Sequence, residues 1–202
     1  MTGFSSLDGE QTFPWLPSGP ALLFAPADRP ERFQKAAERS DMVIIDLEDG
    51  AAVDNHEQAR ANIINNPLDP ETTILRITGP GTPTFAEDVA FARACDYDIV
   101  MVPKIRDSIP AELEGLKIIA MIETPQAMIN IQQIATHPDV VGLFWGAEDL
   151  TAELGGVSSR QSVDENPRRH YRDPQRLARA LVQVHAAAAG IAAIDAIHAD
   201  FR

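Results

Sequence analysis

The stretch VVGLFWGAEDL, from Val140 to Leu150, is a nearly continuous apolar run that ends in two adjacent acids, Glu148 and Asp149. A continuous run of this length, rather than an alternating one, is typical of a parallel strand that is covered on both faces. The same pattern recurs earlier in the chain, in MVIIDL (42–47), IVMVP (99–103) and IIAMI (118–122). We therefore expect a parallel sheet with charged residues at the ends of its strands.

Segments with helical spacing separate these runs, and several begin with Asp, Thr or Pro, as helices do. Alternating strands and helices predict an α/β fold, and the charged strand ends favour a TIM (β/α)8-type barrel over an open doubly wound sheet. A dinucleotide-binding fold would need a GxGxxG after its first strand, and LFAPADRPERF has none. The seven expected strands are 21–25, 42–47, 73–77, 99–103, 118–122, 140–145 and 193–199.

The domain assignment is a loose arm at residues 1–20, rich in Ser, Gly and Pro, followed by one barrel-type domain at 21–202. A closed barrel needs an eighth strand and about two more helices, which usually bring it to ~250 residues. We therefore expect an open barrel, a barrel closed by another chain, or a shortened member of a longer family.

The net charge of −13 and the pI near 4.7 argue against nucleic acid or an anionic membrane surface as the partner. Cys95 is the only cysteine, so an intrachain disulfide is impossible, as suits a reducing cytosol. We interpret Cys95 as a small buried hydrophobe rather than a nucleophile. Neither a membrane-length apolar stretch nor a signal-peptide pattern is present, and a cytoplasmic location is expected.

The carboxyl ends of the expected strands gather acids, and parallel strands bring these ends to one mouth. Carboxylates that converge there repel one another unless a cation or a proton neutralises them. Oxygen ligands without Cys or His favour Mg²⁺ over zinc, and Mg²⁺ typically takes one or two protein carboxylates. Glu123 and Asp149, on adjacent strands, are the predicted metal ligands. The alternative is that such acids cap the helices that follow. The acids concerned are Asp28, Asp46, Glu48, Asp49, Glu123, Glu148 and Asp149.

Arg76, in ILRITG, places a guanidinium at the inner end of an apolar strand. An arginine there suits a planar carboxylate bidentately, so we expect a substrate carboxylate as its partner, with Asp46 or Glu48 as the alternative. For Lys104 and Arg29, binding of an anion and simple exposure to solvent are equally compatible with the sequence. The segment 158–173 is polar and rich in arginine, and we expect a loop over the mouth. His170 is not expected to bind a metal, because no second His stands at ligand spacing from it. His198 is interpreted as a core histidine rather than a catalytic base.

Together, these motifs resemble the citrate lyase beta-subunit family of the HpcH/HpaI aldolase/citrate lyase superfamily, which includes malyl-CoA and citramalyl-CoA lyases. The resemblance starts near Leu22 and reaches the last residue. It rests on LFAPADRPERFQKAAERSDMVIIDLEDGAAVDNHEQARANI, LRITG, VMVPKI, IIAMIETPQAM and GLFWGAEDLTAELGG. It implies a TIM barrel, usually a homotrimer or a multiple of one. The implied activity is Mg²⁺-dependent cleavage of a 3-hydroxyacyl thioester, of CoA or a carrier protein, to an oxo acid and an acetyl-thioester.

By position, the resemblance implies that Glu123 and Asp149 bind the metal, and that Arg76 and Glu123 contact the oxo acid. It implies that Glu48 and Asp49 order the metal's waters, as outer partners of a metal site do. The turn that contains Pro26 and Arg29 would lie near the nucleotide or phosphopantetheine arm.

Members of the family continue for roughly seventy residues beyond the segment that this chain matches, through an eighth strand and, in the CoA lyases, a lid that carries an acid/base aspartate. An alternative function is therefore a non-catalytic, truncated relative that binds Mg²⁺ and an oxo acid, or that acts as an oligomeric partner. An open edge after the seventh strand also predicts self-association, because its unpaired backbone groups are a template for pairing.

Overall fold

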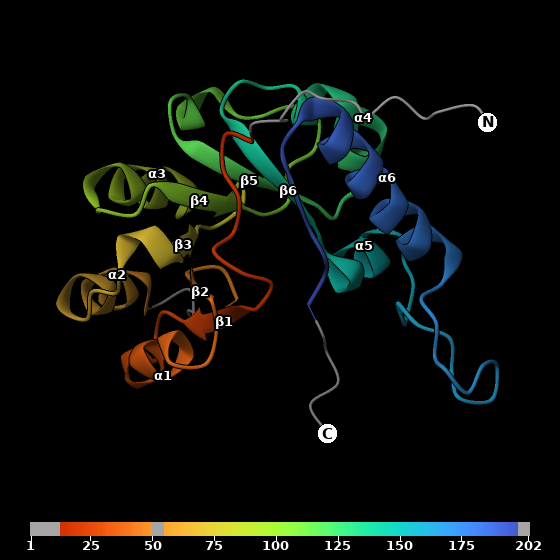
Figure 1. The fold of residues 1–202 in the computed structure, drawn as a ribbon, viewed down its shortest axis with the longest axis horizontal. Helices are drawn as coiled ribbons and strands as arrows, with labels where there is room; N and C mark the ends of the chain where they lie inside the picture. Colours follow the sequence, from red (N-terminus) through yellow and green to blue (C-terminus); the bar gives the residue numbers. More distant parts are fainter. Residues whose placement is uncertain (1–12, 50–54, 198–202) are drawn as a thin grey trace, which may run out of the picture.

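The computed structural model describes residues 13–49 and 55–197. Its centre is a seven-stranded parallel sheet in which the strands follow one another in chain order and curl into a half-barrel (Figure 1). The edge strands of the described sheet are the first and the seventh. The strands are β1 (Leu22–Pro26), β2 (Met42–Asp46), β3 (Thr73–Arg76), β4 (Ile99–Val102), β5 (Lys117–Ile122), β6 (Val140–Trp145) and β7 (Ala192–Ile194).

Helices between the strands cover the outer face of the sheet (Figure 1). The α-helices are α1 (Phe33–Ala37), α2 (His56–Asn65), α3 (Phe85–Ala94), α4 (Pro125–Ala135), α5 (Ala147–Glu153) and α6 (Asp173–Ala189). Short 3-10 helices are η1 (Pro30–Arg32), η3 (Pro70–Thr72) and η4 (Ala111–Leu113). Within the described ranges, no helix combines the length and the apolar character that crossing a membrane requires.

Two apolar clusters lie on opposite faces of the sheet, because successive side chains of a strand point to opposite sides. In β2, Val43 and Ile45 belong to the larger cluster, which includes helix residues such as Ile131 and Val182. Met42 and Ile44 belong to the smaller cluster on the inner face. Burial on both faces explains why the strand sequences are continuously apolar.

The expected strands all exist, and their bounds agree with the structure to within one or two residues except at the last. β7 covers only Ala192–Ile194, whereas the sequence predicted 193–199. Pairing with β6 ends at Ile194, and the Asp195 carboxylate accepts hydrogen bonds from Trp145 Nε1 and from the backbone N–H of Ala196. His198 lies outside the described residues, and so do the first twelve residues of the predicted arm.

The pairing of β5 with β6 contains a register shift. Ile118 pairs with Val140, but Ile119 pairs with Gly142, so β6 carries one extra residue at this point. The shift changes which face each side chain of β6 reaches: Val141 and Phe144 belong to the inner cluster, and Leu143 and Trp145 to the outer one. Trp145 therefore faces the helices, where its ring lies 5.1 Å from that of Tyr171 in an edge-to-face contact.

Candidate functional site

A cavity of about 530 Å³ opens at the carboxyl ends of the strands, where the sequence predicted the site. Its apolar wall comes from the inner cluster and includes Phe24, Met121 and Phe144. Its polar lining brings together residues from β2, β3, β5 and the start of α5, namely Asp46, Asp49, Arg76, Glu123, Glu148 and Asp149. The cavity thus combines an apolar wall with a cluster of carboxylates and one guanidinium.

Glu123 follows β5 and is completely buried. Its Oε1 accepts a 2.8 Å hydrogen bond from the backbone N–H of Lys104, but its Oε2 has no hydrogen-bond partner among the described residues. Burial, followed by the nearby charge of Asp149, raises the pKa of Glu123 from 4.5 to about 8. A buried carboxylate oxygen without a partner is costly, so this atom has the chemistry of a vacant ligand position.

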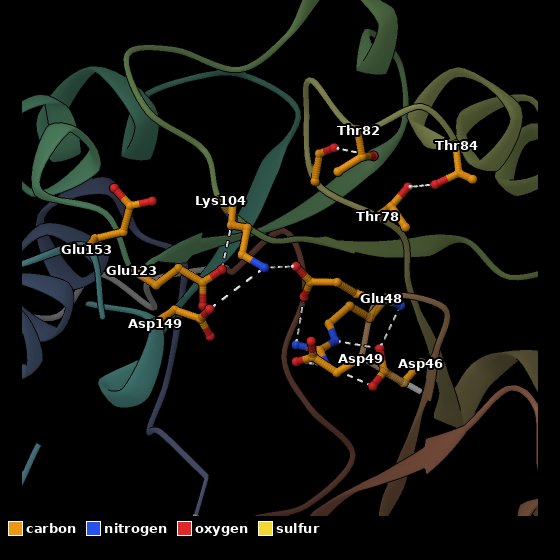
Figure 2. A network of polar contacts seen from close by, with 12 residues as sticks. Asp46, Glu48, Asp49, Thr78, Thr82, Thr84, Lys104, Glu123, Asp149 and Glu153 are labelled. Atoms are coloured by element: carbon orange, nitrogen blue, oxygen red, sulfur yellow. Dashed lines mark hydrogen bonds and ion pairs between the residues drawn. The ribbon is translucent and has the colours of Figure 1, made fainter. Parts of the chain in front are cut away.

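Gly146, the residue between β6 and α5, makes room for this carboxylate. A Cβ atom at position 146 would lie 2.2 Å from Glu123 Oε2 and 2.9 Å from Glu123 Cβ, far inside van der Waals contact. The glycine lets the two strand ends approach closely, so that Glu123 points into the cavity beside the first turn of α5 (Figure 2).

Asp149 lies in that first turn, and Figure 2 shows its carboxylate next to Glu123. The side chain is 40% exposed, and its Oδ1 lies 3.7 Å from Lys104 Nζ. Among the described residues, no group of three or more acids, histidines or cysteines has metal-binding geometry. Two carboxylates, one of them with an unpartnered oxygen, nevertheless fit Mg²⁺, which fills the rest of its octahedron with water and substrate oxygens.

Lys104 connects the two groups of acids. Its Nζ lies 2.6 Å from Glu48 Oε1, and its backbone has a φ of +53°, a left-handed conformation that is uncommon for lysine. That conformation lets the backbone N–H reach Glu123 while the ammonium group reaches Glu48 and Asp149 (Figure 2). The sequence left Lys104 open between an external anion and solvent, and its partners in the structure are protein carboxylates.

Arg76, at the end of β3, is held by acids of the β2 end. Its Nε and Nη2 bind the two oxygens of Asp46, each at 2.7 Å, its Nη1 lies 3.0 Å from Glu48 Oε2, and its Nη2 lies 3.1 Å from Asp49 Oδ2. The guanidinium also covers the Phe24 ring at 4.9 Å. The structure thus records the alternative partners, Asp46 and Glu48, around an arginine that still lines the cavity. Despite burial, these carboxylates raise the pKa of Arg76, which stays cationic.

Glu48 and Asp49 differ in how firmly they are held. The Glu48 side chain is 9% exposed and lies between Arg76 and Lys104, and burial raises its pKa although both cations oppose the shift. The Asp49 side chain is 68% exposed, and within the described ranges its one ion-pair partner is Arg76. Asp49 is therefore the carboxylate that an incoming anion displaces most easily.

Of the other residues that the sequence singled out, the structure places some outside this cavity and one in its lining. Pro26 ends β1 and Arg29 is exposed, and neither lines the cavity. Glu148 does line it, and its Oε1 accepts a 2.6 Å hydrogen bond from Ser159 Oγ. The arginine-rich segment 158–173, expected over the mouth, contributes no residue to the cavity lining. It packs instead against Trp145 and α6, and it lines a second cavity.

Comparison with known proteins gives consistent matches. The family described as HpcH/HpaI aldolase/citrate lyase matches residues 21–114 and 106–202. A citrate lyase subunit beta-like protein of Mycobacterium tuberculosis is 43% identical over 184 residues, which are 91% of this chain and 66% of that protein. An L-malyl-CoA/beta-methylmalyl-CoA lyase of Cereibacter sphaeroides is 30% identical, over 89% of this chain and 66% of the lyase. The chain therefore spans just under two thirds of the length of these relatives.

Solved structures agree with these matches. The CitE protein of M. tuberculosis, solved in complex with magnesium and pyruvate, superposes with a TM-score of 0.85 at 43% identity, over 91% of this chain and 75% of that one. The same protein was also solved with magnesium, acetoacetate and coenzyme A, with a TM-score of 0.85. RipC of Yersinia pestis superposes with a TM-score of 0.67 at 30% identity, over 90% of this chain and 77% of that one. By both sequence and structure, the chain belongs to the HpcH/HpaI aldolase/citrate lyase family.

Proposed function

We propose that this chain forms the metal and oxo-acid site of a Mg²⁺-dependent carbon–carbon lyase. Its substrate would be a short 3-hydroxyacyl thioester of the citryl, malyl or citramalyl type, carried on CoA or on a carrier protein, and its products an oxo acid and an acetyl-thioester. One observation carries the proposal: a buried, unpartnered oxygen of Glu123 lies beside Asp149 in the cavity that Arg76 also lines.

Glu123 and Asp149 would hold the metal. The Glu123 oxygen that lacks a hydrogen-bond partner gains one when a cation binds, and the repulsion between the two carboxylates is relieved. Held by these two residues, Mg²⁺ would supply Lewis-acid chemistry that stabilises negative charge on the oxo oxygen of the product. Lys104 would keep its 2.6 Å contact with Glu48 and give up its 3.7 Å contact with Asp149, because the metal would then neutralise the Asp149 carboxylate.

Arg76 would bind the carboxylate of the oxo acid. Four of its five N–H donors already have partners, so the carboxylate would take the free N–H of Nη1 and replace Asp49 at Nη2. Asp46 would keep its bidentate contact and hold the guanidinium plane. Asp49, once released, and Glu48 would order water around the metal.

The apolar wall of the cavity suits the methylene groups of a short acyl chain, and the solved relative with coenzyme A supports a thioester substrate. The turn at Pro26 and Arg29 remains the proposed contact for the nucleotide or phosphopantetheine arm. A cytoplasmic location and a homo-oligomer, trimeric or a multiple of three, belong to the same proposal.

Calorimetric titration of oxaloacetate and of glyoxylate tests the site, first with Mg²⁺ and then with EDTA. We expect binding that requires Mg²⁺ and that Asp149→Asn abolishes. The matched control is Asp96→Asn, which removes the same charge from an exposed position outside the cavity. Binding that persists in EDTA, or that both variants weaken equally, would contradict the metal site.

A separate assay for turnover separates the two functions considered. Malyl-, citramalyl- and citryl-thioesters are incubated with the protein and Mg²⁺, and the release of oxo acid is followed. Release from one of them supports the lyase. Mg²⁺-dependent binding without release from any of them would instead favour the non-catalytic relative that binds metal and oxo acid.

A further inference from the structure

The segment between α5 and α6, together with α6 itself, lines a second cavity of about 610 Å³ that the lyase site does not use. None of the described residues lines both cavities. Where the first is lined by carboxylates, this one is lined by five arginines and a histidine, with no acid among the lining residues: Arg160, Arg168, Arg169, His170, Arg176 and Arg179. We call it the arginine pocket. It is unexpected in a chain with a net charge of −13.

The wall of the pocket is attached to the core of the fold. Tyr171 packs edge-to-face on Trp145 of β6, and the Arg160 guanidinium lies 3.8 Å over the Tyr171 ring. Arg160 and Tyr171 also form an antiparallel backbone bridge. Stacking on a ring fixes the plane of a guanidinium and leaves its N–H edge pointing outward, which is how arginines are oriented for oxyanions. One of these groups, Arg160 Nη1, donates a 3.4 Å hydrogen bond to the backbone carbonyl of Arg169.

A tight turn presents two further arginines. The side chain of Asn166 accepts a hydrogen bond from the backbone N–H of Arg168, and its backbone carbonyl accepts one from Arg169. Arg169 has a φ of +48°, so a side chain other than glycine is held in the left-handed region. Across the described part of the chain, neither Arg168 nor Arg169 has an ion-pair partner.

The nearby acids neutralise only two of the five arginines. Arg179 binds Asp195, and Arg176 Nη1 lies 3.3 Å from Asp173 Oδ1. Among the described residues, Arg160, Arg168 and Arg169 have no ion-pair partner, and Glu165 is bound by Arg172, which is outside the lining. A sphere of 610 Å³ is roughly 10 Å across, which is about one Debye length at 0.1 M salt, so solvent ions screen the arginines from one another only in part. An anion that fills the space removes this repulsion and binds several guanidinium groups at once.

From this geometry we propose that the arginine pocket is a binding site for a small molecule that carries two or more phosphate groups. The volume matches that of small-molecule sites, and several convergent guanidinium forks match the many oxygens of linked phosphates better than a single carboxylate. Arg176 and Arg179 project from one face of α6, because residues three apart on a helix are neighbours. The site is independent of the proposed lyase activity.

Calorimetric titration with tripolyphosphate, in EDTA and at constant ionic strength, tests the proposal. The absence of Mg²⁺ keeps the probe from entering the lyase site as a metal complex. We expect saturable binding that Arg168→Gln/Arg169→Gln weakens by at least tenfold. The matched control, Lys35→Gln/Arg39→Gln, removes two exposed cations from α1 and its end, and should change the affinity by less than twofold.

Three results would overturn the proposal: no binding, equal weakening by both double variants, or citrate binding more tightly than tripolyphosphate. A folding defect is separated from a binding defect by Arg169→Gly, which removes the guanidinium and suits the left-handed backbone. This variant should unfold at the wild-type temperature or above it, and should still lose affinity for tripolyphosphate.

Discussion

Replacing Glu123 with glutamine should change how the stability of the metal-free protein depends on pH. The folded protein raises the pKa of Glu123 from its ordinary value of 4.5 to about 8. A group whose pKa is higher in the folded state than in the unfolded state stabilises the fold fully at pH values below the unfolded pKa. That stabilisation is lost as the pH rises through the folded pKa. Ionised Glu123 therefore destabilises the metal-free fold above pH 8, whereas an amide at this position carries no charge to bury.

The shift of about 3.5 pKa units sets the size of the effect. At roughly 1.4 kcal/mol per unit, the ionised carboxylate costs on the order of 5 kcal/mol, less whatever relaxation of the site recovers. For a domain of this length, 1 kcal/mol corresponds to roughly 2–4 °C in melting temperature. Between pH 5 and pH 9, the melting temperature of Glu123→Gln should therefore rise by on the order of 10 °C relative to the wild type.

The assay is thermal unfolding in EDTA at a series of pH values, followed by circular dichroism. Glu112→Gln, which neutralises an exposed acid away from the cavity, is the matched control and should follow the wild-type curve. Saturating Mg²⁺ should remove the wild-type loss at high pH and leave Glu123→Gln unaffected. Parallel pH curves for the wild type and Glu123→Gln in EDTA would refute the reasoning from burial.

Three further substitutions have expected outcomes. Gly146→Ala should destabilise the fold by about 1–3 kcal/mol in urea titrations and weaken Mg²⁺ binding, because the new methyl group collides with Glu123; unchanged Mg²⁺ affinity would contradict this. Arg76→Lys removes the planar guanidinium that Asp46 holds through a bidentate contact. Calorimetry should show at least a tenfold loss of oxo-acid affinity while Mg²⁺ still binds. Asp88→Ala should cost about 3–5 kcal/mol in urea titrations, because Arg60 loses the fully buried carboxylate that it binds at 2.7 Å; a loss below 1 kcal/mol would show the pair to be unimportant.

The strands and the acidic cavity could be predicted because both follow from local pattern and from one geometric rule. Continuous apolar runs mark strands buried on both faces, and parallel strands in a barrel bring their carboxyl ends together. Glu123 and Asp149 are therefore neighbours in the structure, although 26 positions separate them in the sequence. The length of β7 was not predictable, because the apolar residues continue past the point where its pairing stops.

The contacts inside the cavity were harder to predict, since they depend on which of several like groups comes closest. The sequence places three carboxylates, Asp46, Glu48 and Asp49, close together at the end of β2. Only the three-dimensional arrangement shows that all three contact Arg76. The left-handed backbone of Lys104 and the close approach at Gly146 leave no periodic signal. The arginine pocket was missed for the same reason: a loop without periodicity does not reveal which face it covers.

The extra residue in β6 has a consequence for how this sequence can change over time. Substitutions along β6 alter one side chain at a time, but losing Val141 or Gly142 would shift the in-and-out alternation of everything between that point and α5. Phe144 and Trp145 would then exchange faces of the sheet. The start of α5 at Ala147 would be rotated with them, and Asp149 would no longer face Glu123. We therefore expect homologues to vary freely in composition along this strand, and to keep its residue count between Asp139 and Asp149 fixed.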